Sequence, residues 1–172
     1  MTSAKPDAIG FYTASFDRLA GQIYAMIGDR DEAQECVQEA FVRAWSHRSQ
    51  LEKAHAPEAW VRTTAHRLAV SRWRRTMRGR RDPDRALQEQ RAHDGPSSDR
   101  VALMAALRQL PEPQRRALVL HHLCDLPVQD VAAEVGVPEG TIKARLSRGR
   151  TALLALLGDE PTTGLTEGAS HA

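Results

Sequence analysis

The sequence has few cysteines and no long hydrophobic run, and both absences restrict the class of protein. Its 172 residues include two cysteines, Cys36 and Cys124, far apart in stretches with helical patterns. This spacing does not support a disulfide framework, and we expect both to be free, buried and unreactive thiols. No run approaches the roughly 18 apolar residues of a spanning helix, and no signal peptide is recognisable. We therefore expect a soluble cytoplasmic protein without direct membrane insertion.

An excess of charge of one sign is also missing. Lysine and arginine total 24 against 22 aspartate and glutamate, which gives a formal net charge of +2 at pH 7. Such a balance identifies no partner, so any basic surface must come from local clustering of charge. The stretch RWRRTMRGRR, residues 72–81, is such a cluster and contains no acid.

Aromatic residues are absent from the second half of the chain. The three Phe, two Tyr and three Trp all lie before residue 74. Only the first half can therefore stack aromatic side chains on unpaired nucleic-acid bases.

The first half has the hydrophobic spacing of amphipathic helices. Apolar residues recur at one-turn intervals from Phe16 to Ile27, and Gly28 follows as a helix end. Asp29, with Glu32 three residues later, marks the N-cap of a second helix. A third helix is expected from about Glu58. The residues expected on the buried face of the second helix are Ala33, Val37, Ala40, Phe41, Ala44 and Trp45.

The second half resumes the helical pattern after a segment rich in proline, glycine, serine and charge. A short helix at Val128–Glu134, the turn VGVP and the stretch from Val137 to Arg150 form a helix-turn-helix outline. Because every strand signal is weak, we predict an all-α fold of two small helical modules joined by a flexible linker. We place the modules at 7–76 and 99–157, the linker at 77–98 and a disordered tail at 158–172.

The helix after the VGVP turn has a face suited to the DNA major groove. At about 100° per residue, the residues Ile142, Leu146, Gly149, Leu153 and Leu157 fall on one buried side. The opposite side is small and neutral, with cationic residues at its borders. Low bulk lets a helix enter the major groove, which is about 12 Å wide, while donors at its borders reach bases and phosphates.

Two long parts of the sequence resemble the sigma factors of bacterial RNA polymerase. The stretch LPEPQRRALVLHHLCDLPVQDVAAEVGVPEGTIKARLSRGRTAL is similar to sigma region 4, which binds the promoter −35 element. The stretches GDRDEAQECVQEAFVRAW and PEAWVRTTAHRLAVSRWRR are similar to region 2. Their order, without a region 3 domain between them, resembles the extracytoplasmic-function (ECF) group of the sigma-70 family. This resemblance implies a region 2 helical bundle, a region 4 helix-turn-helix and a role in transcription initiation.

The resemblance also implies three functional surfaces. Contacts to the −35 element are implied for Thr141, Lys143, Ala144, Ser147 and Arg148, which agree with the outward face and border that the helical spacing indicates. A surface for the clamp helices of the polymerase β′ subunit is implied for Asp31, Glu35, Gln38, Glu39 and Arg43. Recognition and melting of the −10 element are implied for Trp60, Arg62, His66, Arg67, Arg72, Trp73, Arg74 and Arg75. Among these we expect the arginines to hold phosphates, and His66 to be a neutral surface residue.

Some residues depart from the family pattern. Arg67 stands where an Asn is frequent, Ser71 where an Asp is common and Ala144 where a Ser is usual. Promoter preference therefore does not transfer. The partners implied are core RNA polymerase, through the β′ clamp helices and the β flap, together with promoter DNA and an anti-sigma factor. We expect no catalytic residue, metal or cofactor.

Two other functions are open to the same sequence. A stand-alone helix-turn-helix regulator of transcription explains the second module, but it leaves the acidic stripe of the first module, formed by Asp31, Glu35, Gln38 and Glu39, without a purpose. A metal-dependent enzyme would have to use HHLCD at 121–125. His121 and His122 point about 100° apart on a helix, and no CxxC or HExxH motif completes a metal site there.

Overall fold

A computed structural model describes residues 8–51, 53, 56–77 and 98–158. Every regular element in these ranges is helical, which confirms the all-α prediction. No helix in the described ranges is long and apolar enough to cross a membrane. The predicted linker and tail lie outside the described residues, except where they overlap the ends of neighbouring helices.

The elements are α1 (Ala8–Ile27), α2 (Arg30–Ser46), α3 (Arg48–Leu51), α4 (Pro57–Met77), α6 (Ser98–Gln109), α7 (Glu112–Leu118), the π-helical turn η2 (Val119–Leu123), α8 (Val128–Val135) and α9 (Glu139–Gly158).

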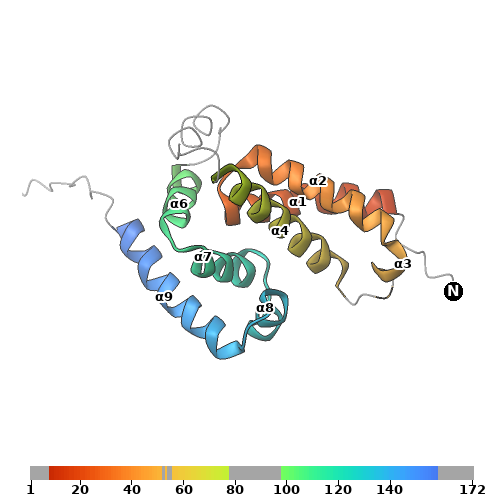
Figure 1. The fold of residues 1–172 in the computed structure, drawn as a ribbon. Coiled ribbons are helices and arrows are strands. Elements are labelled where there is room, and N and C mark those ends of the chain that lie inside the picture. The colour runs from red at the N-terminus through yellow and green to blue at the C-terminus, as the bar shows by residue number, and fades with distance from the viewer. Residues whose placement is uncertain (1–7, 52, 54–55, 78–97, 159–172) are drawn as a thin grey trace, which may run out of the picture.

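The first module is built from α1, α2 and α4, which pack side by side (Figure 1). Asp29 caps α2 as predicted, because its Oδ1 accepts a hydrogen bond from the Glu32 backbone N–H at 3.0 Å. Gly28 adopts φ +80° between α1 and α2, a conformation that glycine reaches without steric cost. In α4, Val61 and Ala65 are fully buried. The predicted buried face of α2 is confirmed for Ala33, Val37, Ala40, Phe41 and Ala44.

The prediction that Trp45 belongs to this buried face is wrong. Its side chain is 55% exposed, and the Arg48 guanidinium lies 5.4 Å from the centroid of its ring. At about 100° per residue, Trp45 lies roughly a quarter turn beyond Ala44. That angle carries the indole past the edge of the packed face and into solvent.

The second module contains α6, α7, η2, α8 and α9. Gly136 ends α8 in the left-handed region at φ +78°, and its N–H donates to the Ala132 carbonyl at 2.8 Å. In α9, the predicted seam is buried at Ile142, Leu146 and Gly149, whereas Leu153 and Leu157 are only half-buried. A β-carbon at position 149 would lie 3.0 Å from Leu118 Cδ1, so glycine permits α9 to approach α7 closely.

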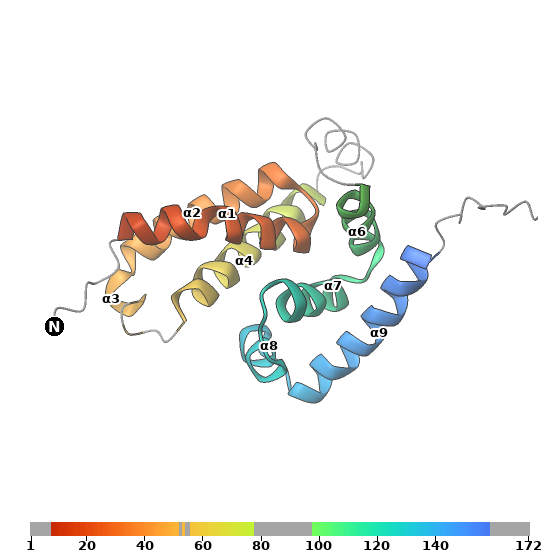
Figure 2. The ribbon, with the colours of Figure 1, turned by 180° about the vertical axis from the view of Figure 1, so that it is seen from behind.

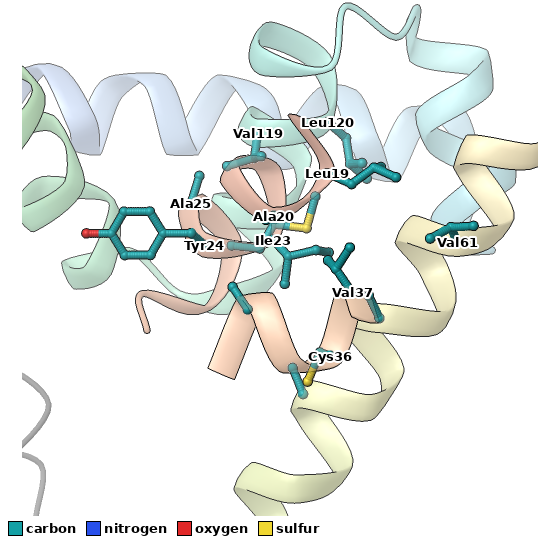
Figure 3. Packing of buried hydrophobic residues seen from close by; sticks show 14 of the residues in the cluster. Leu19, Ala20, Ile23, Tyr24, Ala25, Cys36, Val37, Val61, Val119 and Leu120 are labelled. Atoms are coloured by element: carbon teal, nitrogen blue, oxygen red, sulfur yellow. The ribbon is translucent and has the colours of Figure 1, made fainter. Parts of the chain in front are cut away.

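The two modules share one apolar core through α1. Figure 3 shows Leu19 of α1 beside Leu120 of η2, while Ile23 of α1 lies near Val37 of α2. Leu19, Ile23 and Leu120 are all completely buried. One helix therefore contributes side chains to packing in both modules, and the second module is held against the first.

Candidate functional site

The face of α9 opposite its buried seam is open to solvent. Lys143, Ser147 and Arg148 are exposed, while Thr141 and Ala144 are half-buried. The helix runs along the outer edge of the molecule in both views (Figures 1 and 2). The predicted −35 residues therefore form a surface that is small at its centre and cationic at its borders. This shape and charge suit the major groove.

The predicted −10 residues Arg62 and His66 lie one turn apart on α4, on a stripe that the second module covers. Arg62 is 4% exposed. Its Nε and Nη2 donate to the two carboxylate oxygens of Glu134, on α8, at 2.9 and 2.8 Å, and its Nη1 donates to Gln22 Oε1 at 3.1 Å. Burial alone lowers the pKa of Arg62, but the hydrogen bonds and charge of Glu134 more than offset this, so its pKa is raised. Arg62 therefore remains a buried, paired cation.

His66 is not the surface residue that we expected. It is 5% exposed, and its Nε2 lies 3.1 Å from Oε1 of Glu112, at the start of α7. The hydrogen bond with His66 holds the pKa of Glu112 below its ordinary value. The helical spacing of α4 alone does not reveal that a second module lies on this face.

Other predicted −10 residues stay accessible on α4. Arg67, Arg74 and Arg75 are exposed, and Trp73 is 59% exposed. Trp60 is half-buried and packs against the core. The structure thus divides the predicted set into three groups: Arg62 and His66 are covered, Trp60 and Arg72 are half-buried, and the exposed residues are Arg67, Trp73, Arg74 and Arg75.

The predicted polymerase-binding residues lie on α2, where Asp31, Glu35, Gln38 and Arg43 are exposed and Glu39 is half-buried. The hydrogen bond from Arg43, and then that from Arg72, holds the pKa of Glu39 below its ordinary value.

Arg72, predicted to contact −10 phosphates, faces this acidic row. Its Nη1 lies 3.2 Å from both Glu32 Oε1 and Glu35 Oε2, and its Nη2 lies 2.5 Å from Glu39 Oε2. Arg72 therefore ties α4 to the acidic stripe of α2.

Both cysteines are free thiols, Cys36 buried and Cys124 half-buried. Burial is the main cause that raises the pKa of Cys36 to about 12 and that of Cys124 to about 11. Because the thiolate is the reactive form, neither side chain is activated for redox chemistry at neutral pH.

The HHLCD stretch shows no metal-binding geometry. His121 Nδ1 lies 2.8 Å from the Leu126 carbonyl oxygen, and the rings of His121 and His122 meet edge to face at 4.7 Å. In the part of the chain that the structure describes, no three His, Cys, Asp or Glu side chains are grouped to hold a metal ion.

Four residues that the sequence did not single out hold the two modules together. Glu134 and Glu112 pair with the covered stripe of α4. Arg108 donates to the Gly28 carbonyl, and Arg115 Nε donates to the Met26 carbonyl at 2.6 Å. One sequence signal for such contacts is Glu134, an acid that directly follows the apolar residues 131–133 of α8.

Comparisons with known proteins match most of the chain. The family model for sigma-70 region 2 matches residues 11–79, and the model for sigma-70 region 4 matches residues 100–153. The chain is 32% identical over 147 residues to the ECF RNA polymerase sigma factor EcfG of Rhodopseudomonas palustris, covering 84% of this chain and 81% of that protein. It is also 32% identical over 146 residues to the ECF RNA polymerase sigma factor SigC of Mycobacterium tuberculosis, covering 81% and 78%.

A solved structure has the same fold over nearly the whole chain. It is the sigma factor RpoE of Bartonella quintana in complex with the anti-sigma factor NepR, with a TM-score of 0.72 and 25% sequence identity. The match covers 91% of this chain and 99% of that one.

Proposed function

The chain belongs to the ECF group of the sigma-70 family of transcription initiation factors, and we propose that it directs core RNA polymerase to promoters by contacting −35 and −10 DNA. The observation that carries this proposal is the open face of α9. Lys143 and Arg148 border a small centre there, within the part of the chain that the region 4 model matches. Cations in these places can donate to guanine edges and phosphates of a −35 duplex.

The first module supplies the surface for the −10 element and for the polymerase. Arg74 and Arg75 are exposed cations directly after the exposed Trp73 in α4, and Arg67 is exposed on the same helix. Phosphate attraction and base stacking together suit an unpaired strand. The acidic stripe of α2, which includes Asp31 and Glu35, suits basic residues of the polymerase clamp helices.

Opening of the −10 duplex is proposed to need the polymerase. Taking a base out of the duplex costs a few kcal/mol, and stacking on an aromatic side chain returns about 1–3 kcal/mol per base. Trp73, the one exposed tryptophan of α4, does not offset the unpairing of several bases. The chain alone is therefore expected to bind duplex DNA without melting it.

The proposed setting is the cytoplasm, with an anti-sigma factor as a further partner. The solved sigma factor of Bartonella quintana, which shares the fold of this chain, was found in complex with an anti-sigma factor. We extend that kind of partner to this chain. The β flap of the polymerase is the proposed contact of the second module.

The test is run-off transcription with core polymerase from the source organism and genomic promoter fragments. We expect a specific transcript that requires the chain and is lost in Glu35→Lys or in Arg148→Ala. Matched controls are Asp17→Lys, an exposed acid on α1, and Arg150→Ala, an exposed cation at the edge of α9. These should retain the transcript. Sequence-specific duplex binding by the chain alone, without a transcript and without polymerase binding, would contradict the proposal.

A further inference from the structure

Three arginines lie where α7 passes between α4 and α9. They are Arg67 on α4, Arg116 on α7 and Arg145 on α9, and together they are called the arginine cluster below. In both views of the fold, α7 lies between the other two helices (Figures 1 and 2). On the α4 side, Arg67 directly follows His66, which contacts Glu112 of α7. Arg116 lies one turn after Glu112, on the same side of α7.

The other side of α7 packs closely on α9. A β-carbon at Gly149 of α9 would lie 3.0 Å from Leu118 Cδ1 and 3.4 Å from Gln114 Cβ, both on α7. Arg145 lies one turn before Gly149, on the same side of α9. The packing of the three helices therefore brings the cationic side chains of the arginine cluster into one place.

The acids nearest the arginine cluster already have other partners. Glu134 shares two hydrogen bonds with Arg62, at 2.9 and 2.8 Å, and Glu112 contacts His66 at 3.1 Å. Among the described residues, no ion pair joins a member of the arginine cluster to an acid. Apart from His66, four guanidinium groups and two carboxylates leave a local charge of +2.

Arg116 is a partly buried cation with an unmet hydrogen-bond donor. Burial is the main cause that lowers its pKa, and the charges of Arg67 and Arg145 lower it further against the opposing pull of two acids. In the described part of the chain, its Nε is buried without a hydrogen-bond partner. Such a donor is rare in folded proteins and calls for an ordered water or an ion. The residue as a whole is half-buried, so a solute can reach it.

We propose that the arginine cluster is a binding site for a phosphate monoester, whose charge of nearly −2 at neutral pH matches the local charge of +2. Guanidinium groups bind phosphate oxygens through two parallel hydrogen bonds, and no other side chain does so as well. A backbone phosphate of nucleic acid is a diester with one negative charge. The charge balance therefore favours a small phosphorylated compound. Neither polymerase nor DNA takes part, so this site stands apart from the proposed function.

The experiment compares two probes that differ in one charge. Methyl phosphate is a monoester and dimethyl phosphate is the matching diester. Each is titrated into the isotope-labelled full chain near neutral pH at constant ionic strength, and NMR follows the Nε–H resonances of the arginines. Methyl phosphate should shift the Arg116 resonance to saturation. Dimethyl phosphate should bind about fivefold more weakly, the effect of one unit charge fewer at about 4 Å in water.

Variants test the members of the arginine cluster one at a time. Arg116→Gln and Arg67→Gln should each weaken the binding of methyl phosphate about tenfold, because each removes a charged hydrogen bond. The Arg145 resonance reports binding in both. The matched control is Arg150→Gln, an exposed cation on α9 outside the cluster, which should keep the wild-type affinity. If Arg116→Gln does not fold, Arg67→Gln decides, because Arg67 is exposed.

Two sets of results would overturn the site. A shift that never saturates, or equal affinities of Arg67→Gln and Arg150→Gln, would show that the phosphate binds no defined cluster. Tighter binding of dimethyl phosphate than of methyl phosphate would overturn the monoester as the ligand. Displacement of methyl phosphate by an equal phosphate concentration of a mixed-sequence single strand of about 12 nucleotides would do the same and assign the cluster to a nucleic-acid backbone.

Discussion

The two surfaces proposed to read DNA differ in their exposure to solvent. On α9, Lys143 and Arg148 face solvent along the edge of the molecule. On α4, Arg62 and His66 are buried against glutamates of the second module. A duplex can therefore reach α9 at any time, whereas part of the −10 face is reached only after the modules separate. The difference shows that helical spacing can propose a DNA-binding face but does not tell whether that face is exposed in the folded chain.

The largest expected effect on stability comes from removing a buried side chain that holds α9 in place. Ile142 is completely buried on the side of α9 opposite Lys143 and Arg148. Ile142→Ala should lower the free energy of unfolding by about 2–5 kcal/mol, because it removes buried methyl groups and leaves a cavity. Leu154→Ala, on the same helix at 70% exposure, should change it by less than about 0.5 kcal/mol. Urea denaturation checks both, and equal losses would contradict the burial of the seam.

The next largest effect on stability is expected at Gly28, where Arg108 of the second module contacts the first module. Alanine there must adopt φ +80°, and its β-carbon would lie 2.7 Å from Arg108 Nε. Gly28→Ala should cost about 1–2 kcal/mol from backbone strain alone, with a further loss from displacing Arg108. The control is Gly21→Ala, inside α1, where a β-carbon meets nothing within 4 Å. It should stabilise the chain by up to about 1 kcal/mol, so thermal unfolding should shift in opposite directions for the two variants.

A smaller effect on stability should distinguish two arginines of α4, one that is paired with acids and one that is exposed. Arg72 pairs with three glutamates of α2, whereas Arg74 is exposed. Arg72→Ala should lower the free energy of unfolding by about 1 kcal/mol, and the loss should shrink at high salt as the charges are screened. Arg74→Ala should leave stability unchanged. Denaturation at low and high salt measures the difference, and a loss at Arg72 that ignores salt would count against the ion-pair account.

The smallest expected effect is a dependence of stability on pH. The hydrogen bond from His66 lowers the folded-state pKa of Glu112 from 4.5. A lowered carboxyl pKa adds stability that is fully present above the ordinary pKa and is lost as pH falls through the lowered one. Glu112→Gln should therefore flatten the decline of the unfolding free energy below about pH 4.5. A decline as steep as that of the wild type would show that this carboxyl contributes nothing.

Features that depend on neighbouring residues in the sequence were predictable. The Asp29 cap, the buried face of α2 through Ala44 and the seam of α9 at Ile142 follow from local spacing, and the structure confirms them. The outward side chains Lys143 and Arg148 followed from the same spacing.

Features that depend on how the modules meet were not predictable in this way. The burial of His66 and the partner of Arg62 come from contacts between residues 46 and 72 positions apart. The predicted burial of Trp45 was wrong for a different reason. A residue at the edge of a helical face is buried only if a neighbouring element extends over it. Spacing along one helix contains no information about either.

The most direct test of the central claim is a footprint of the chain on a promoter found by run-off transcription. DNase protection and permanganate reactivity of unpaired thymines are measured with and without core polymerase. The account predicts that two separate elements are protected when both proteins are present. Thymines near −10 should become reactive only under that condition, and −35 protection should be lost in Arg148→Ala. Protection of a single duplex site by the chain alone, unchanged by polymerase and without reactive thymines, would contradict the account and identify a stand-alone regulator.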